Sequence, residues 1–340
     1  MEFGIFDHVD ERQQPLAQMF DERIEFIRAA EDSGFRGYHV AEHHCTPLGM
    51  APSPGVWLSA VARETSTIRF GPMVYLLPLY HPLRLIEEIC MLDHLSNGRL
   101  EVGVGRGVSP VEIGMFGVDP AESPAMYMEA LDLIHRGLTV DKLSFEGKYY
   151  QYEDVPMSIK PLQKPVPFWS ASMSPDGQTL AARHGMHSCA LGDLKTVKQA
   201  TDNYKALWTE HAGDPLRQID AKHQLLVGAY RQVIIADTDA EAEKLAGPVY
   251  RDWFDKLIKL WKERNVDAPF LGSMGEFEVA RKAGLVVVGS PNSVADELNR
   301  HAQECGFNYL VAQIAFGNLT HAQEMRSLEH FTKTVIPAMN

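Results

Sequence analysis

Two adjacent histidines, His43 and His44, follow Glu42 at the end of a short apolar segment. Neighbouring residues of an extended segment point to opposite sides, so one imidazole can face a binding site while the other packs elsewhere. A neutral imidazole in a binding site could shuttle a proton near neutral pH or hydrogen-bond a bound ring. Ligands offered by consecutive strand residues diverge, and no third ligand stands at a recognisable spacing, so we predict no metal site. A purely structural histidine pair is the alternative to acid–base chemistry.

A glycine-rich segment, Gly103-Val104-Gly105-Arg106-Gly107, follows another apolar run. A dinucleotide fingerprint would require glycine where the chain has Val108, and it would follow the first strand rather than the fourth. The glycines instead allow a ring or a phosphate to approach the backbone closely, and Arg106 offers a fixed guanidinium to its oxygens. A glycine turn with a salt-bridged arginine is the alternative interpretation.

Small polar residues precede a helical segment at residues 178–184, and among them are Ser172, Ser174 and Gly177. Hydroxyls and backbone N–H groups at a helix N-terminus form an anion site. A serine N-cap alone would explain one of these residues and not the whole group. The segment therefore favours phosphate binding.

Short β-rich segments alternate with longer helical ones along the chain, and this alternation must position the three motifs. The candidate strands are residues 2–6, 37–41, 68–76, 100–104, 167–171, 187–190, 225–235 and 309–314. The periodic, helix-like segments between them are residues 20–33, 55–64, 83–95, 127–137, 194–211, 240–264 and 293–305. Such alternation implies right-handed βαβ units and a parallel sheet. Eight strands predict an α/β fold, a (β/α)8 TIM barrel forming a single domain over residues 1–340.

A barrel places its active site at the C-terminal ends of the strands. All three motifs follow candidate strands, so we expect them to meet at one end of the barrel. Gly34 and Gly306 suit left-handed helix C-caps just before strands. An open doubly wound sheet is the alternative, but it needs the nucleotide fingerprint that the chain lacks.

Two segments interrupt the alternation and are expected as insertions in the later βα units. Residues 140–167 carry a hairpin-like stretch and then four prolines, which predicts a stiff extended excursion. Residues 265–285 are irregular and precede a β-like run at 286–288. This second segment is either a substrate-side lid or a surface loop without a role.

The charge, the hydrophobic runs and the cysteines of the chain exclude several classes of protein. The net charge of −13 argues against nucleic acid as a partner, because binding it needs clustered Lys and Arg. No apolar run approaches the length of a membrane helix, and the N-terminus lacks the features of a signal peptide. Four scattered cysteines are typical of reduced thiols. We therefore expect a cytoplasmic enzyme.

The motifs, taken in order, resemble those of the bacterial luciferase-like flavin-dependent monooxygenases across nearly the whole chain. The segments that carry the resemblance are Glu42-His43-His44, Leu77-Pro78-x-x-His81-Pro82, Asp93-x-Leu95-Ser96-x-Gly98-Arg99, Gly103 to Gly107 with Glu112 and Phe116-Gly117, Gln163-Lys164-Pro165, Ser172-x-Ser174-Pro175-x-Gly177 with Ala181-Ala182, and Gly289-Ser290-Pro291. The resemblance implies an oxidoreductase that binds reduced FMN at the C-terminal mouth of its barrel. Reduced flavin and O2 would form a C4a-(hydro)peroxide that attacks a small aldehyde, ketone or similar substrate.

The resemblance also implies roles for individual residues. His43 would be catalytic, with His44 beside it and Glu112 as an acidic group near the flavin ring. A non-proline cis peptide would join Met73 and Val74 beneath the ring. The residues expected to hold the ring and phosphate, together with that peptide, are Gly105, Arg106, Ser172, Ser174 and Gly177.

Two departures from the family pattern bear on these expectations. Gly105 stands where luciferase has a cysteine beside the flavin, which weakens any expectation of light emission. Pro124 stands where a second phosphate-binding arginine is expected, so Tyr127 or another residue would have to replace it.

The resemblance further implies a dimer, either a homodimer or a luciferase-like heterodimer, and a separate NAD(P)H:flavin reductase as a partner. An F420-dependent dehydrogenase on the same barrel and a non-catalytic flavin-binding partner subunit are the alternatives.

Overall fold

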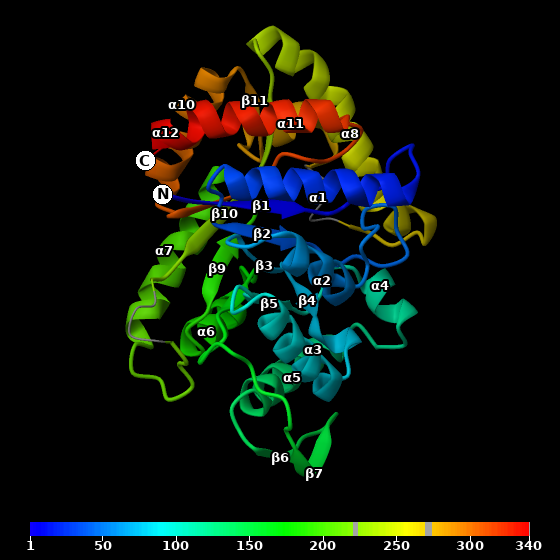
Figure 1. Ribbon diagram of the computed structural model, residues 1–340, viewed down its shortest axis with the longest axis vertical. Helices are drawn as coiled ribbons and strands as arrows, with labels where there is room; N and C mark the ends of the chain where they lie inside the picture. Colours follow the sequence, from blue (N-terminus) through cyan, green and yellow to red (C-terminus); the bar gives the residue numbers. More distant parts are fainter. Residues whose placement is uncertain (220–223, 269–273, 340) are drawn as a thin grey trace.

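A parallel sheet curls into a nearly closed barrel in the computed structural model, which describes residues 1–219, 224–268 and 274–339 (Figure 1). Its strands within that part of the chain are β1 (Glu2–Asp7), β2 (Gly37–Val40), β3 (Arg69–Pro72), β4 (Tyr75–Leu76), β5 (Val102–Gly105), β8 (Phe168–Ser170), β9 (His187–Ala190), β10 (Val227–Ile235), β11 (Val286–Gly289) and β12 (Tyr309–Gln313). They follow the order β3-β2-β1-β12-β10-β9-β8-β5-β4, with β11 paired to β10. A parallel bridge between Phe70 and Leu100 joins β3 to the residues just before β5. The predicted (β/α)8 barrel is confirmed.

Helices surround the sheet. They are α1 (Leu16–Asp32), α2 (Pro54–Glu64), α3 (Pro82–Leu95), α4 (Pro110–Met115), α5 (Ser123–Gly137), α6 (Pro175–Arg183), α7 (Leu194–Glu210), α8 (Asp239–Glu263), α9 (Phe277–Lys282), α10 (Pro291–Cys305), α11 (His321–His330) and α12 (Ile336–Met339). Gly34 and Gly306 have φ values of 82° and 71° at the ends of α1 and α10, so the two predicted left-handed turns are confirmed.

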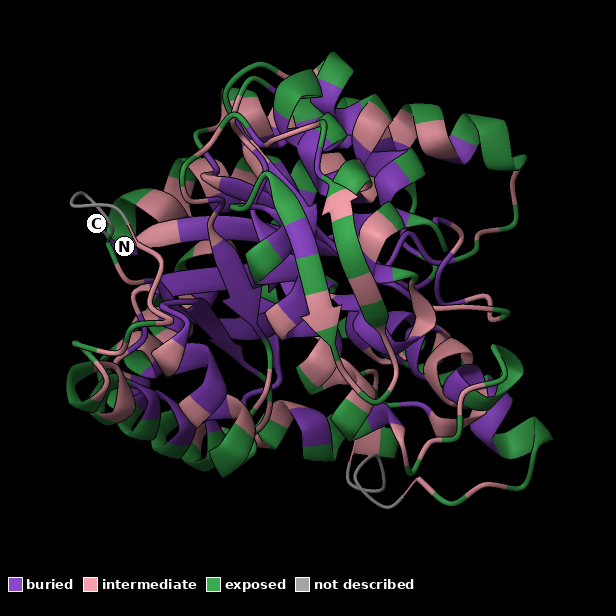
Figure 2. Ribbon diagram, turned by 90° about the horizontal axis from the view of Figure 1, so that it is seen from below, coloured by how far each residue is buried: buried purple, intermediate pink, exposed green. Residues whose placement is uncertain are grey.

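Several boundaries differ from those expected. The segment at 68–76 forms two strands rather than one, because a cis peptide between Met73 and Val74 separates β3 from β4. The segment at 265–285 is not wholly irregular, since it contains α9; residues 269–273 within it lie outside the described residues. The hairpin expected within 140–167 is present as β6 (Lys142–Glu146) and β7 (Gln151–Pro156). Figure 2 shows this hairpin largely exposed, in contrast to the buried strands of the barrel.

Two glycines, which have no side chains, allow β3 and β5 to approach closely enough to close the barrel. A Cβ atom on Gly71 would lie 1.6 Å from the carbonyl oxygen of Glu101. A Cβ atom on Gly103 would lie 2.1 Å from the carbonyl oxygen of Pro72. Both obstacles are backbone atoms that cannot rotate away, so only glycine allows the two strands to approach this closely.

Side chains fill the interior of the barrel in layers. One buried apolar cluster draws its members from most strands: Phe6, Ala41, Met73, Trp169, Cys189, Leu226, Tyr230, Tyr309 and Val311. Alternate residues of a strand share a side, so the residues two positions beyond several of these members face the axis nearer the C-terminal mouth. Four of those residues are polar: His8, His43, Gln232 and Gln313. A polar layer therefore covers the apolar one at the mouth.

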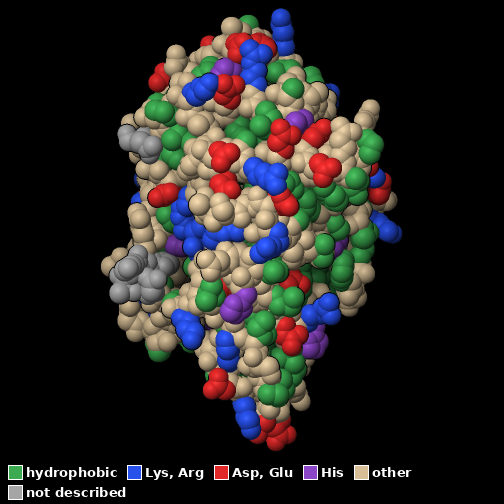
Figure 3. Space-filling view, in the orientation of Figure 1, with side chains coloured by type: hydrophobic (Ala, Val, Ile, Leu, Met, Phe, Trp, Pro, Cys, Tyr) green, Lys and Arg blue, Asp and Glu red, His purple; other side chains and the backbone are tan. Residues whose placement is uncertain are grey.

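The surface carries charges of both signs, which are intermixed on the face shown in Figure 3. No helix among the described residues is long and apolar enough to cross a membrane. All four cysteines are free thiols, and only Cys45 is exposed.

The closure at Gly103 gives a testable expectation for stability. The substitution Gly103→Ala should lower the free energy of unfolding by about 1–3 kcal/mol or more, because its methyl group collides with fixed backbone. Urea unfolding followed by circular dichroism measures the change. The control Gly247→Ala, in α8 with open space around the new methyl group, should be neutral or slightly stabilising. Equal effects of the two substitutions would contradict this account of closure.

Candidate active site

His43 and Glu112 meet at the C-terminal mouth of the barrel. His43 follows β2, and Glu112 lies in the short helix α4, which the sequence pattern did not predict. The Nδ1 atom of His43 is 3.3 Å from Oε1 of Glu112. The other carboxylate oxygen, Oε2, accepts a 2.8 Å hydrogen bond from the backbone N–H of His44. Ser109 caps α4 and accepts a bond from the backbone N–H of Glu112, which fixes the position of the carboxylate.

The protonation of Glu112 reflects these contacts. Burial alone would raise the pKa of this carboxyl, but the adjacent His43 and the hydrogen bonds from His43 and His44 outweigh it. Its pKa is therefore held below the ordinary value, and the group is ionised near neutral pH. An ionised carboxylate only accepts hydrogen bonds, so the Nδ1 of His43 carries a proton and donates it to Glu112 in a hydrogen bond. The Nε2 of His43 remains available to a molecule bound at the mouth.

His44 has a different environment, as the alternation at this segment predicts. Its Nε2 is 2.7 Å from Oε1 of Glu42, and its ring packs edge-on against Phe116 at 4.5 Å. The Oε2 of Glu42 accepts hydrogen bonds from the hydroxyl of Tyr80 and the backbone N–H of Leu76. Burial raises the pKa of Glu42 despite these bonds. Glu42, held by His44, thus joins the segment after β2 to β4 and the residues that follow it.

His8, which no motif singled out, lies beside His43. The centroids of the two rings are 5.5 Å apart, and the ring of Trp253 of α8 lies 6.1 Å from that of His8. Sequence reasoning missed His8 because a lone histidine after a first strand carries no local signal. Its position two residues beyond the apolar Phe6 was the only available indication.

The expected cis peptide between Met73 and Val74 is present at the same mouth. Met73 belongs to the apolar cluster inside the barrel, and Val74 packs against that cluster. A Cβ atom on Gly105 would lie 2.5 Å from Cγ2 of Val74. A cysteine at position 105 would therefore force Val74 to move, which gives a physical reason for the glycine there.

Arg106 is exposed at the end of β5 and, among the described residues, makes no hydrogen bond or ion pair. The serine loop lies after the neighbouring strand β8. Ser174 caps α6 and accepts a bond from the N–H of Gly177, and its hydroxyl is 3.1 Å from that of Ser172. A Cβ atom on Gly177 would lie 2.0 Å from the Ser172 hydroxyl, so glycine keeps the loop compact.

Pro124 begins α5, where proline is well suited to the first turn of a helix. Tyr127, the suggested replacement for a second phosphate-binding group, is half-buried against the principal hydrophobic core. Of the groups that the sequence predicts to hold a phosphate, Arg106 and the loop from Ser172 to Gly177 lie at this mouth.

These residues fit a flavin mononucleotide. A solvent-facing cation without a partner among the described residues, and a hydroxyl-rich helix N-terminus after the adjacent strand, match a phosphate. Gly105, which packs against Val74 without a side chain of its own, leaves bare backbone at this mouth that a flat ring could approach closely. No group of three His, Cys, Asp or Glu side chains that could hold a metal ion occurs within the described ranges.

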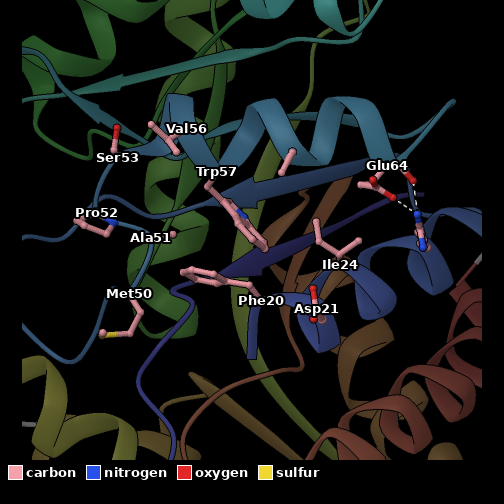
Figure 4. A pocket seen from close by; sticks show the side chains of 12 residues that line it. Phe20, Asp21, Ile24, Met50, Ala51, Pro52, Ser53, Val56, Trp57 and Glu64 are labelled. Carbon is pink, nitrogen blue, oxygen red and sulfur yellow. Dashed lines mark hydrogen bonds and ion pairs between the residues drawn. The ribbon is translucent and has the colours of Figure 1, made fainter. Parts of the chain in front are cut away.

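Two cavities elsewhere contain none of these residues. One of about 610 Å³ lies between α1 and α2 on the outside of the barrel and is lined by side chains such as Phe20 and Trp57 (Figure 4). A more polar one of about 410 Å³ lies at the opposite end of the barrel, beside Arg36 and Glu101.

A family model described as luciferase-like monooxygenase matches residues 1–309. The chain belongs to this family. A protein named y4wF from Sinorhizobium fredii, described as uncharacterised, is 36% identical over 318 residues, covering 93% of this chain and 91% of the relative. The oxygenase component of flavin-dependent trigonelline monooxygenase from Acinetobacter baylyi is 25% identical and covers 100% of this chain, with 96% of its own length matched.

Solved structures share the fold of this luciferase-like protein. One is the oxygenating constituent of 3,6-diketocamphane monooxygenase from Pseudomonas putida in complex with FMN, with a TM-score of 0.79, 23% identity, and coverage of 100% of this chain and 99% of that chain. Enzymes dependent on the deazaflavin F420 also have this fold, so the fold alone does not decide between the two cofactors.

The Glu112 contacts predict a pH-dependent contribution to stability. Glu112→Gln should lower the free energy of unfolding by about 1–3 kcal/mol near neutral pH, because a charged acceptor of two hydrogen bonds is lost. The folded-state pKa lies below the ordinary 4.5, so this stabilisation is complete above pH 4.5 and is lost as the pH falls through the lowered value. Urea unfolding across that range measures it.

The variant Glu153→Gln, at an exposed position of β7, provides the matched control for Glu112→Gln and should leave stability unchanged. A difference between wild type and Glu112→Gln that stayed constant on acidification would show that Glu112 is not ionised through these contacts.

Proposed function

We propose that the protein is a reduced-FMN-dependent monooxygenase that acts on a small organic substrate such as an aldehyde or ketone. The observation that carries the proposal is the meeting of the His43–Glu112 pair with Arg106 and the serine loop at one mouth of the barrel. Reduced FMN supplies two electrons, so that one oxygen atom of O2 enters the substrate and the other leaves as water.

The protein's own residues have separable tasks in this proposal. Arg106, Ser172, Ser174 and the N–H groups at the start of α6 hold the phosphate. Met73, Val74 and Gly105 border the flavin ring. Glu112 orients His43 through Nδ1, which leaves Nε2 to hold or deliver a proton in the site.

The comparison with known oxygenases also supports a proposal about protein partners. The trigonelline relative is named as an oxygenase component, which supports a separate reductase that delivers reduced flavin here. We also propose that the protein acts as a dimer, as the family resemblance implies. An F420-dependent dehydrogenase remains the second candidate, because F420 enzymes share the barrel.

Rapid mixing tests the proposed reaction. The anaerobic complex with reduced FMN, mixed with air-saturated buffer, should show a transient near-ultraviolet absorbance that differs from the spectra of both reduced and oxidised FMN. Immediate formation of oxidised FMN without the transient would overturn the monooxygenase proposal. Tight binding of F420 together with failure to bind FMN would favour the dehydrogenase.

The phosphate assignment is tested with two flavins that differ only in the phosphate. Arg106→Ala should weaken the binding of reduced FMN about tenfold or more, since a charge-assisted contact is lost. It should leave the binding of reduced riboflavin unchanged, as measured by anaerobic titration. Arg28→Ala, which removes a cation paired with Glu64 on the outer surface, is the control. An equal loss for both flavins would place the guanidinium at the ring instead.

The catalytic assignment is tested at His43. His43→Ala should retain FMN binding but lower product formation by on the order of 10²-fold or more, because a positioned acid–base group is lost. Product yield per reduced flavin, measured by chromatography, gives the comparison. Full turnover by the variant would show that His43 is not the acid–base group.

A further inference from the structure

His8 is a buried histidine at the mouth that the proposed function does not use. It follows β1 and belongs to the polar layer above the apolar interior, where it is 6% exposed. Phe6 packs edge-on beneath its ring at 4.9 Å. Trp253 of α8 and His43 flank it.

One nitrogen of His8 faces hydrogen-bond donors. Its Nδ1 is 2.8 Å from Nε2 of Gln313 and 3.4 Å from the indole Nε1 of Trp253. An indole N–H only donates, so the Nδ1 of His8 accepts. The ring nitrogen that accepts carries no proton.

A network of hydrogen bonds, called the relay below, fixes the amide of Gln313 with its nitrogen toward His8. Its oxygen accepts a hydrogen bond from the hydroxyl of Tyr230 and another, of 3.2 Å, from Nε2 of Gln232. With its oxygen engaged by two donors, the amide presents N–H to His8. These residues are all buried, which makes a reversal of the amide costly.

The other nitrogen of His8 consequently carries the proton. Burial, with a smaller effect of the neighbouring His43, lowers the pKa of His8 well below its ordinary value, so the ring is neutral. A neutral imidazole that accepts at Nδ1 donates at Nε2. Among the described residues, no partner accepts a hydrogen bond from this Nε2–H.

His8 and His43 therefore present opposite hydrogen-bonding character at the mouth. Glu112 holds the Nδ1 proton of His43, which leaves Nε2 of that ring for proton transfer. Gln313 and Trp253 donate hydrogen bonds to Nδ1 of His8, so the Nε2 of this ring is a fixed donor. A substrate beside the two rings would meet one proton-transferring group and one permanent hydrogen-bond donor.

We propose that His8 is a substrate-positioning residue whose Nε2–H donates a hydrogen bond to the carbonyl oxygen of the substrate. The inference rests on the proposed function, which supplies an aldehyde or ketone as the substrate class. The donor orients the carbonyl beside His43 and favours carbonyl compounds over hydrocarbons of the same shape.

Nuclear magnetic resonance tests the tautomer without flavin or substrate. Long-range 1H–15N correlation spectra of protein labelled with 15N-histidine should show His8 with Nδ1 unprotonated and Nε2 protonated near neutral pH. His8→Gln assigns the signal by its disappearance. A spectrum with the proton on Nδ1, or averaged between the nitrogens, would overturn the proposal.

A charge substitution at position 313 tests the relay. Gln313→Glu replaces the amide donor with a carboxylate acceptor, so the His8 proton should appear on Nδ1 in the variant. Gln151→Glu, at an exposed position of β7, should leave the His8 spectrum unchanged. An unaltered His8 tautomer in Gln313→Glu would show that Gln313 does not set it.

Two probes of one shape test carbonyl recognition. Titration of the labelled wild-type protein with cyclohexanone should shift the His8 Nε2 resonance, whereas methylenecyclohexane, which lacks an acceptor, should not. Equal shifts, or none with cyclohexanone, would overturn the role of His8 as a carbonyl donor. Because flavin is absent, a failure of FMN to bind or react would count against the proposed function and not against these results.

Turnover separates positioning from structural support. His8→Phe should raise the KM for a carbonyl substrate about five- to tenfold, the effect of one neutral hydrogen bond, with a smaller change in kcat. His8→Gln places an amide N–H near the original Nε2 and should recover part of the loss. Equal KM values for the two variants would indicate that the ring serves packing alone.

Discussion

The alternation of side chains along the barrel strands is the constraint on which the site depends. Each strand directs every second residue toward the axis. The same four chain segments that contribute Phe6, Ala41, Tyr230 and Val311 to the apolar layer therefore contribute polar residues to the layer above it. A shift of one residue in any strand would exchange these side chains with those packed against the helices. The close backbone approach at Gly71 and Gly103 holds this register where β3 meets β5.

Two carboxylates at the mouth illustrate how small differences in surroundings set protonation. Glu42 and Glu112 both lie beside a histidine, yet burial dominates at Glu42 and raises its pKa, while hydrogen bonds and His43 dominate at Glu112 and lower its pKa. Environments that push the pKa values of similar groups apart are characteristic of acid–base sites. Glu112 can hold a charge beside His43, whereas Glu42 is better suited to fixing the segments around His44.

Much of the fold could be predicted from the sequence, because strands and helices differ in the period of their apolar residues. Each of the eight predicted strand segments coincides with a strand of the sheet, although the segment at 68–76 is divided and β11 is an additional strand. The motif residues His43, Arg106 and Ser172 lie at one end, as the rule for barrels requires. Local pattern could not reveal α4, which is only six residues long, or the division of β3 from β4. The position of the cis peptide came from family resemblance, since no periodicity encodes it.

Several residues at the mouth could not be predicted from the sequence, for one physical reason. His8, Gln232 and Gln313 become a site only when three strands distant in sequence lie side by side, and each alone is an unremarkable polar residue in an apolar run. The Trp253 contact comes from α8, whose register against the barrel no local spacing determines. Such sites are encoded by tertiary contacts rather than by motifs.

The two ends of the barrel differ in how their charges are satisfied, and this difference supports the proposal that the chemistry occurs at the C-terminal mouth. At the N-terminal end, Glu101 accepts hydrogen bonds from Arg36, Arg69 and the indole of Trp169, and these arginines hold its pKa far below the ordinary range although burial opposes them. Breaking such a pair would leave a buried charge uncompensated, so the network stabilises that end as it stands. At the other end, Arg106 has no protein partner in the described chain, and Nε2 of His8 has no acceptor. Groups without a protein partner retain their capacity to bind, so a ligand is expected at the mouth where Arg106 and His8 leave hydrogen bonds incomplete.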